Sequence, residues 1–234
     1  MTLYGPTTLF GRLVAASADD WRAYVGHPFV RALDAATLPE ACFRRYLGQD
    51  YLFLIQFARA YALAAYKAED LDDIRQASAA LAAIVDREMA LHVAFAARWG
   101  VSENEMRALP EADATTAYTR FVLDRGAAGD LLDLHVALAP CIVGYAEIGL
   151  ALSARPAVPL ADHPYREWIE AYAAEAYVEV ARAEVGQLDR LMANRGGEGR
   201  FPGLAATFRR ATRLESAFWA MGLSAADARP GVGD

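Results

Sequence analysis

The stretch from Leu138 to Gly149 combines groups that could do chemistry with residues that an ordinary core helix avoids. It reads Leu-Ala-Pro-Cys-Ile-Val-Gly-Tyr-Ala-Glu-Ile-Gly and lies in the middle of a long apolar segment. Interior proline and glycine together cost about 3 to 5 kcal/mol of helix propensity. We therefore expect a reason other than core filling for the composition of this stretch.

Cys141 and Tyr145 are four residues apart, so on a helix both side chains point to the same face. Pro140 lacks an N–H group, and the helix should bend or restart there. If it restarts, Cys141 lies at a new helix N-terminus, where the helix dipole favours the thiolate and makes the sulfur a better nucleophile. The alternative is that Cys141 is a small buried hydrophobic residue.

A carboxylate on an aromatic stripe is the second candidate for chemistry. Asp50 shares one predicted helix face with Tyr46, Phe53 and Phe57, at spacings i, i+4, i+7 and i+11. A carboxylate in such a place is costly unless it is paired or hydrogen-bonded. It could bind a ligand, or it could form a salt bridge with an arginine on a neighbouring helix.

Glu215 is the third candidate, because Phe218 and Trp219 follow it at i+3 and i+4. If the carboxyl group is buried beside these rings, loss of hydration would raise its pKa and keep it protonated near neutrality, as a general acid requires. A surface glutamate that reaches solvent is the alternative.

The elements that must position these residues are all predicted to be helices. Ala and Leu are abundant and β-branched residues are sparse, which favours helix over sheet. Ser102 and Glu105 form a capping-box pattern after Gly100, a predicted helix C-cap. The expected longer helices span 7–25, 29–36, 39–67, 71–99, 112–127, 130–154, 165–192 and 204–221.

Length and composition narrow the class of protein. A chain of 234 residues can bury one substantial core, and we expect a single domain over 1–234 with 225–234 as a flexible tail. The net charge of -7 and scattered basic residues argue against a nucleic-acid partner. The two distant cysteines indicate a reducing compartment, by default the cytoplasm. We expect no membrane association, because no uninterrupted apolar run reaches 18 residues.

Five separate stretches together resemble the thiaminase II (TenA) family, in the same order and at similar spacing over nearly the whole chain. They are His27-Pro28-Phe29-Val30, Thr37-Leu38-Pro39, Gln49-Asp50-Tyr51, the run from Pro140 to Gly149, and Glu215-Ser216-Ala217-Phe218-Trp219. The resemblance implies an all-α, single-domain helical bundle of the haem-oxygenase-like type, assembled into homotetramers. It also implies a hydrolase that needs no metal or organic cofactor. That hydrolase would release ammonia from 4-amino-5-aminomethyl-2-methylpyrimidine during thiamin salvage, and it could also cleave thiamin.

The resemblance also implies a role for each site residue. Cys141 matches the catalytic nucleophile, Glu215 the acid that protonates the ring nitrogen, and Asp50 the residue that hydrogen-bonds the 4-amino edge and the adjacent ring nitrogen. Tyr145 matches a tyrosine near the thiol. The remaining matches are positions that line the substrate pocket: Phe53, Tyr118, Tyr172 and Phe218.

Two positions depart from the family pattern, and two other functions compete with this interpretation. Val143 and Leu214 stand where aromatic residues are common, which leaves substrate preference open.

The first competing function is that of a metal-dependent oxidase on the same fold, for which Glu88, His92 and Glu147 could begin a ligand set. The second is a non-enzymatic scaffold or regulatory protein.

Overall fold

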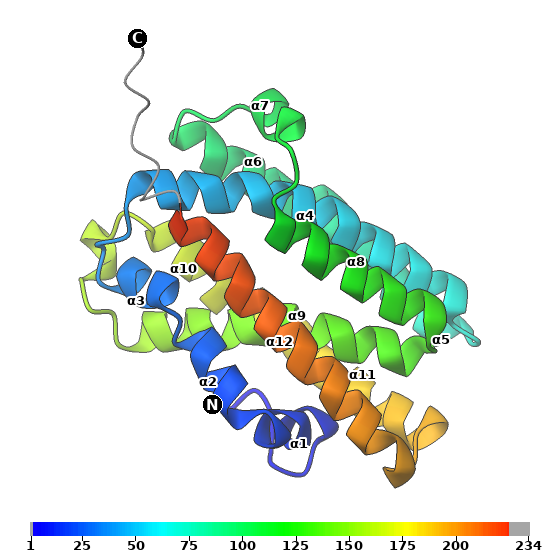
Figure 1. Cartoon of the computed structure of the whole chain (residues 1–234). Helices are drawn as coiled ribbons and strands as arrows, with labels where there is room; N and C mark the ends of the chain where they lie inside the picture. Colours follow the sequence, from blue (N-terminus) through cyan, green and yellow to red (C-terminus); the bar gives the residue numbers. More distant parts are fainter. Residues whose placement is uncertain (1, 225–234) are drawn as a thin grey trace. The chain divides into compact units, whose positions relative to one another are not determined.

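The chain is all-α: the computed structural model describes residues 2–224 and contains no strand in that range (Figure 1). The helices are α1 (Leu9–Ala16), α2 (Ala18–Val25), α3 (Pro28–Asp34), α4 (Glu40–Lys67), α5 (Leu71–Ala83), α6 (Met89–Arg98), α7 (Glu103–Ala108), α8 (Asp113–Ala128), α9 (Leu131–Ala154), α10 (Arg166–Ala173), α11 (Glu175–Arg195) and α12 (Phe201–Leu223). The π-helical turn η1 (Ile84–Glu88) joins α5 to α6, and the 3-10 turns are η2 (Leu160–Asp162) and η3 (Glu198–Arg200). The expected tail, 225–234, lies outside the described residues.

The helices form two compact units that alternate along the sequence. Unit 1 contains the residues up to Leu38 together with Leu132–Ser216, and unit 2 contains Pro39–Leu131 and the residues from Ala217. Nearly all of α9 belongs to unit 1, whereas α12 begins in unit 1 and ends in unit 2.

Most predicted helices are confirmed, and the differences are local. The long helix α4 begins directly after Pro39, the capping box of Ser102 and Glu105 is formed, and Gly100 has a φ of 71°. Two expected helices are each split, the first at Ser17 and the one over 165–192 at Ala174, whose extended backbone has a ψ of 139°. Neither break carries a proline or glycine, but Ser17, followed by Asp19 and Asp20, has the pattern of a helix N-terminus.

The two glycines of the Leu138–Gly149 stretch are explained by close packing in unit 1. A Cβ atom at Gly144 would lie 2.4 Å from the ring of Tyr24, and one at Gly149 would lie 2.6 Å from the backbone of Tyr172. Each glycine therefore lets another residue of unit 1 approach α9 closely. The Tyr24 hydroxyl also donates a hydrogen bond of 3.3 Å to the carbonyl oxygen of Pro140.

The expectation that the helix could restart at Pro140 is wrong, because α9 runs through Pro140 without interruption. Cys141 is therefore inside a helix and has no helix N-terminus beside it to favour the thiolate.

Helix α9 is long and apolar enough to cross a membrane, but 72% of its most apolar window is buried inside the protein. That burial identifies α9 as a core helix.

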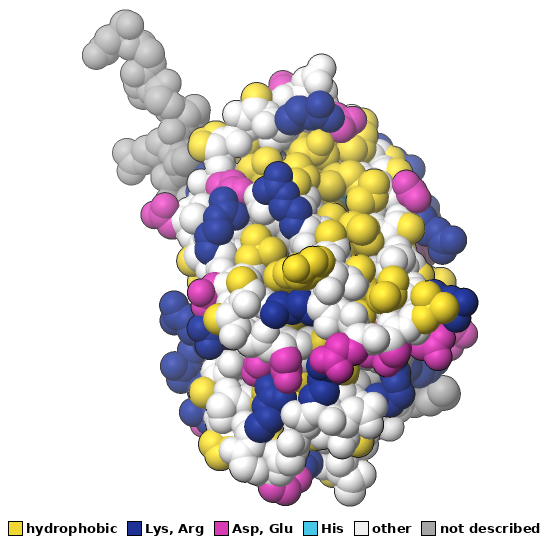
Figure 2. Space-filling model, turned by 90° about the vertical axis from the view of Figure 1, so that its right-hand side faces the viewer, with side chains coloured by type: hydrophobic (Ala, Val, Ile, Leu, Met, Phe, Trp, Pro, Cys, Tyr) yellow, Lys and Arg dark blue, Asp and Glu magenta, His cyan; other side chains and the backbone are white. Residues whose placement is uncertain are grey.

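Several large hydrophobic side chains of unit 2 remain exposed. They lie at the end of α4, on α5, on η1 and on α6, and they are Tyr66, Leu71, Ile74, Val85 and Leu91. Tyr66 is the most exposed of them, at 87%. Figure 2 shows one face of the surface, where hydrophobic side chains gather among charged ones. Solvent-facing apolar groups of this size often mark contact surfaces.

Candidate active site

Three consecutive residues of α4 each bind a different helix of unit 2. The side-chain oxygen of Gln49 accepts hydrogen bonds from the Ala112 amide at 2.8 Å and the Thr115 hydroxyl at 2.7 Å, at the start of α8. The Tyr51 hydroxyl donates to Glu103 on α7 at 3.0 Å. Asp50 pairs with His92 on α6. The Gln49-Asp50-Tyr51 run thus ties α4 to three neighbouring helices.

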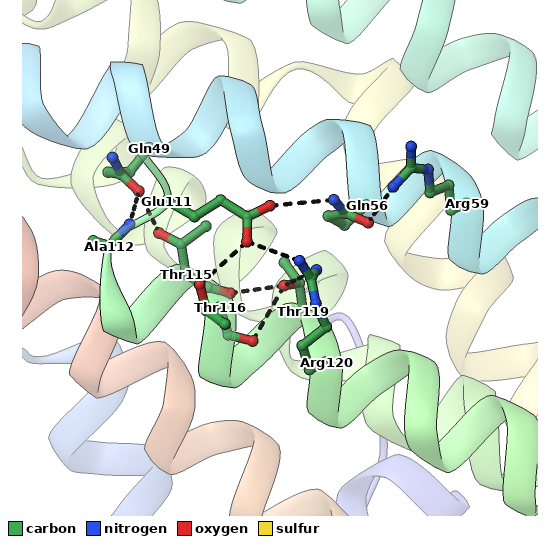
Figure 3. Close-up of polar contacts among 9 residues, drawn as sticks. All are labelled: Gln49, Gln56, Arg59, Glu111, Ala112, Thr115, Thr116, Thr119 and Arg120. Carbon is green, nitrogen blue, oxygen red and sulfur yellow. Dashed lines mark hydrogen bonds and ion pairs between the residues drawn. The ribbon is translucent and has the colours of Figure 1, made fainter. Parts of the chain in front are cut away.

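A polar network fixes α8 against α4 (Figure 3). Glu111 accepts hydrogen bonds from Gln56 of α4 at 3.2 Å and from Thr116 of α8 at 3.1 Å, and it pairs with Arg120 at 3.0 Å. These contacts set the position of α8, which carries Tyr118.

The aromatic stripe on α4 is confirmed, and it carries a buried acid. Tyr46, Asp50, Phe53 and Phe57 are all buried. The Tyr46 hydroxyl donates to Oδ2 of Asp50 at 3.0 Å, and the same oxygen pairs with Nε2 of His92. An arginine partner for Asp50 was the alternative suggested by the sequence, and it is wrong, because the partner is a histidine.

Three of the predicted pocket residues meet in unit 2. The ring centroid of Phe53 lies 5.1 Å from that of Tyr118 on α8 and 5.7 Å from that of Phe218 on α12. Tyr46 connects this cluster to Asp50, since its ring lies 6.2 Å from Phe218. Rings at these separations form a surface suited to one face of a flat heterocycle.

Electrostatics in this part of unit 2 are set by three titratable groups, of which Asp50 and His92 are buried and Glu88 is half-buried. Burial alone would lower the pKa of His92, but the charge and hydrogen bond of Asp50, with Glu88 nearby, raise the pKa to about 9. Loss of hydration raises the pKa of Glu88 to about 7, although His92 opposes this shift. His92 is therefore charged at neutral pH and Glu88 is partly protonated.

The remaining predicted residues lie in unit 1. Cys141 and Tyr145 are on α9, and the Tyr145 ring lies 4.9 Å from that of Tyr172 on α10. Trp168 completes this aromatic group, 4.7 Å from Tyr172. Glu215 on α12 is only 1% exposed, so the interpretation as a surface glutamate is wrong. Cys141 is half-buried.

A metal site on the residues suggested by the sequence is not formed. Both ring nitrogens of His92 are engaged, one by Asp50 and the other by the carbonyl oxygen of Glu88 at 2.9 Å. Glu147 instead accepts hydrogen bonds from Tyr4 at 2.8 Å and Trp21 at 3.3 Å. Within residues 2–224, no three His, Cys, Asp or Glu side chains are grouped as a metal ion would require.

Sequence reasoning missed the role of His92. The local pattern places it one turn from Glu88, whereas its side-chain partner, Asp50, is 42 positions away. Tyr46 is on the predicted face, and its i, i+4 spacing to Asp50 was the available signal for the hydrogen bond.

Comparisons with known proteins agree on one family. Residues 15–225 match the model of the TENA/THI-4/PQQC family. An aminopyrimidine aminohydrolase of Halalkalibacterium halodurans is 38% identical, with 86% of this chain and 89% of that protein aligned. A crystal structure described as a TenA family transcription regulator, from Silicibacter, is 42% identical with a TM-score of 0.88. It covers 92% of this chain and 96% of its own. A TenA homologue from Pyrococcus horikoshii is 25% identical with a TM-score of 0.85, and the match covers 94% of this chain and all of that one.

Proposed function

Because the chain belongs to the TENA/THI-4/PQQC family, we propose that it is an aminopyrimidine aminohydrolase, a hydrolase that acts on a C–N bond. The substrate is 4-amino-5-aminomethyl-2-methylpyrimidine, and the products are hydroxymethylpyrimidine and ammonia for thiamin salvage. The observation that carries this proposal is the match, over most of the chain, to relatives named aminopyrimidine aminohydrolase. They are the protein of Halalkalibacterium halodurans and one of Bacillus subtilis, which is 28% identical over 88% of this chain. A Schizosaccharomyces pombe protein named as a putative hydroxymethylpyrimidine/phosphomethylpyrimidine kinase also contains a 36% identical segment.

The proposed reaction uses Glu215 as the acid and the sulfur of Cys141 as the nucleophile. Glu215 protonates a ring nitrogen and makes the ring electrophilic, and the thiolate of Cys141 then forms a C–S bond to a ring carbon. The displaced electron pair expels the amine from the exocyclic methylene, and this amine takes the proton that the Cys141 thiol has lost, so that it leaves as ammonia. Water adds to that methylene as hydroxyl, and its remaining proton goes to the sulfur as the C–S bond breaks. The ring nitrogen returns its proton to Glu215, which restores the ring, the thiol and the acid.

The residues around these groups support the division of roles. Glu215 is buried, which suits an acid that must stay protonated until it meets a basic nitrogen. Asp50 is a buried carboxylate next to aromatic rings, which suits an acceptor for the 4-amino group. Tyr145, Tyr172, Phe53, Tyr118 and Phe218 supply aromatic walls, and the buried Val143 and Leu214 leave the preferred leaving group open.

We also propose a cytoplasmic homotetramer. The exposed apolar residues of unit 2, such as Tyr66 and Leu71, support assembly between copies of the chain. Sizing by light scattering tests this: replacement of both residues by serine should lower the measured mass, and an unchanged mass would exclude this surface from the interface.

One assay tests the enzymatic proposal against a regulatory role, such as the Silicibacter protein has by its description as a transcription regulator. We expect ammonia release from the aminomethylpyrimidine to exceed thiazole release from thiamin. Cys141→Ala should abolish turnover and Cys42→Ala should preserve it. Purified protein that releases neither product would favour the non-enzymatic interpretation, and activity that requires an added metal would favour the oxidase-like alternative.

A further inference from the structure

The hydrogen bonds of Asp50 are distributed unequally over its two oxygens. The Tyr46 hydroxyl and Nε2 of His92 both bind Oδ2. Among the residues that the structure describes, Oδ1 accepts no hydrogen bond. One oxygen is therefore fixed within the protein, and the other keeps its capacity for a ligand.

The contacts of His92 define which atoms carry protons. Nδ1 faces the carbonyl oxygen of Glu88, which can only accept a hydrogen bond, so Nδ1 carries a proton. Nε2 faces Oδ2 of Asp50, and the charge and hydrogen bond of Asp50 raise the pKa of His92 to about 9. This raised pKa favours the charged imidazolium, in which both ring nitrogens donate.

We propose that His92 is a positioning residue that determines specificity, because its charged ring pairs with Oδ2 of Asp50 and leaves Oδ1 as the acceptor for a ligand. The proposal rests on the aminopyrimidine function above. A carboxylate that cannot donate favours the 4-amino edge of a pyrimidine, which donates, over a 4-oxo edge, which accepts.

Asp50 and Glu88 are the charged groups that act on the protonation of His92. On α4, Tyr46 reaches His92 only through Asp50. On α7, Glu103 binds Tyr51 and Arg107, and it does not bind His92. The residues that pack next to α6 form an apolar cluster that includes Leu52, Ala96 and Met106. On α6 itself, the Phe95 ring meets the imidazole at 6.5 Å.

The charge of His92 can be measured without any ligand. In ¹⁵N-labelled protein at pH 7.5, we expect its two ring nitrogens to show the chemical shifts of an imidazolium, assigned by their loss in His92→Gln. The other three histidines serve as internal references. If the variant does not fold, correlations between the ring and the backbone assign the signals instead, and a neutral His92 at this pH would overturn the proposal.

Specificity is tested with two ligands, hydroxymethylpyrimidine and its 4-oxo counterpart, as competitive inhibitors. We expect the preference for the amino compound to fall roughly 10- to 100-fold in His92→Gln, as for loss of a charge-assisted hydrogen bond. Tyr46→Phe is the matched control, because it removes the other bond to Oδ2 without removing a charge, and the preference should fall less than about 5-fold.

The outcomes separate this inference from the function on which it rests. Wild-type protein that binds neither pyrimidine would defeat the proposed function and this inference with it. Wild-type protein that prefers the amino compound, with the same preference in His92→Gln, would defeat only the inference.

Discussion

A single side chain, Asp50, shows how the protein keeps a charged group among aromatic rings. Its carboxylate is 5% exposed, and it is stabilised by a charged histidine and a phenolic hydroxyl. A buried acid that has lost such a partner is strongly destabilising, typically by about 3 to 5 kcal/mol. The pair therefore serves stability as well as the proposed recognition of substrate.

The two cysteines differ in exposure, and this difference predicts their reactivity. Cys42 is fully buried, and its sulfur lies 3.4 Å from the carbonyl oxygen of Leu223, whereas Cys141 is half-buried. We expect iodoacetamide to modify Cys141 faster, as followed by peptide mass spectrometry, and hydroxymethylpyrimidine to protect it. Equal labelling of both thiols, unaffected by ligand, would count against a nucleophilic Cys141.

Glu215 offers a second prediction at the scale of one residue. Glu215→Gln keeps the size of the buried side chain but removes its acidic proton, so kcat should fall about 100-fold or more. Steady-state ammonia release measures the effect, and circular dichroism confirms that the variant is folded. An unaffected kcat would remove Glu215 from the mechanism.

At the scale of the helices, α9 shows why glycine is needed in a buried helix. The backbone of Tyr172 lies so close to Gly149 that any larger residue meets main-chain atoms, which cannot move aside as the end of a side chain can. The position of α10, and with it Tyr172, depends on this approach.

Gly149→Ala should therefore lower the free energy of unfolding by about 1 to 3 kcal/mol, through overpacking. Gly186→Ala on α11 is the matched control, because its Cβ atom would enter open space, and we expect a gain of about 0.5 to 1 kcal/mol. Urea denaturation measures both. Equal effects from the two substitutions would show that the contact with α10 is unimportant.

Long periodic helices, caps and the aromatic stripe were predictable because each depends on residues near in sequence. Glycine at 100, the capping box of Ser102 and the face of α4 are examples. The pairing of His92 with Asp50 was not predictable, because the two residues are 42 positions apart. Whether Cys141, Glu215 and Asp50 share one substrate stays a prediction from the resemblance.

For the whole molecule, the buried pair predicts how stability depends on pH. The pKa of His92 in the folded protein, about 9, exceeds its ordinary value of 6.5. The contribution of His92 to the free energy of unfolding is therefore complete below pH 6.5 and is lost as the pH rises through 9. Glu88 acts in the same direction at lower pH, since its pKa of about 7 exceeds 4.5.

We therefore expect the free energy of unfolding to fall by about 1 to 3 kcal/mol between pH 6.5 and 9.5 because of His92. Denaturation at a series of pH values measures this, and His92→Gln should be less stable throughout but lack that part of the slope. A variant with the wild-type slope would assign the pH dependence to other groups.

The alternation of the two units along the chain has a consequence for biosynthesis. During translation, the whole of Pro39–Leu131 is made before Leu132–Ser216, the segment with which the residues up to Leu38 form unit 1. The residues up to Leu38 therefore lack their packing partners until the ribosome has made the intervening helices. Helix α12 is made last and completes both units. We therefore expect chaperones to bind the nascent N-terminal segment. Its apolar residues Phe10 and Trp21 pack against Phe208, which has not yet been synthesised.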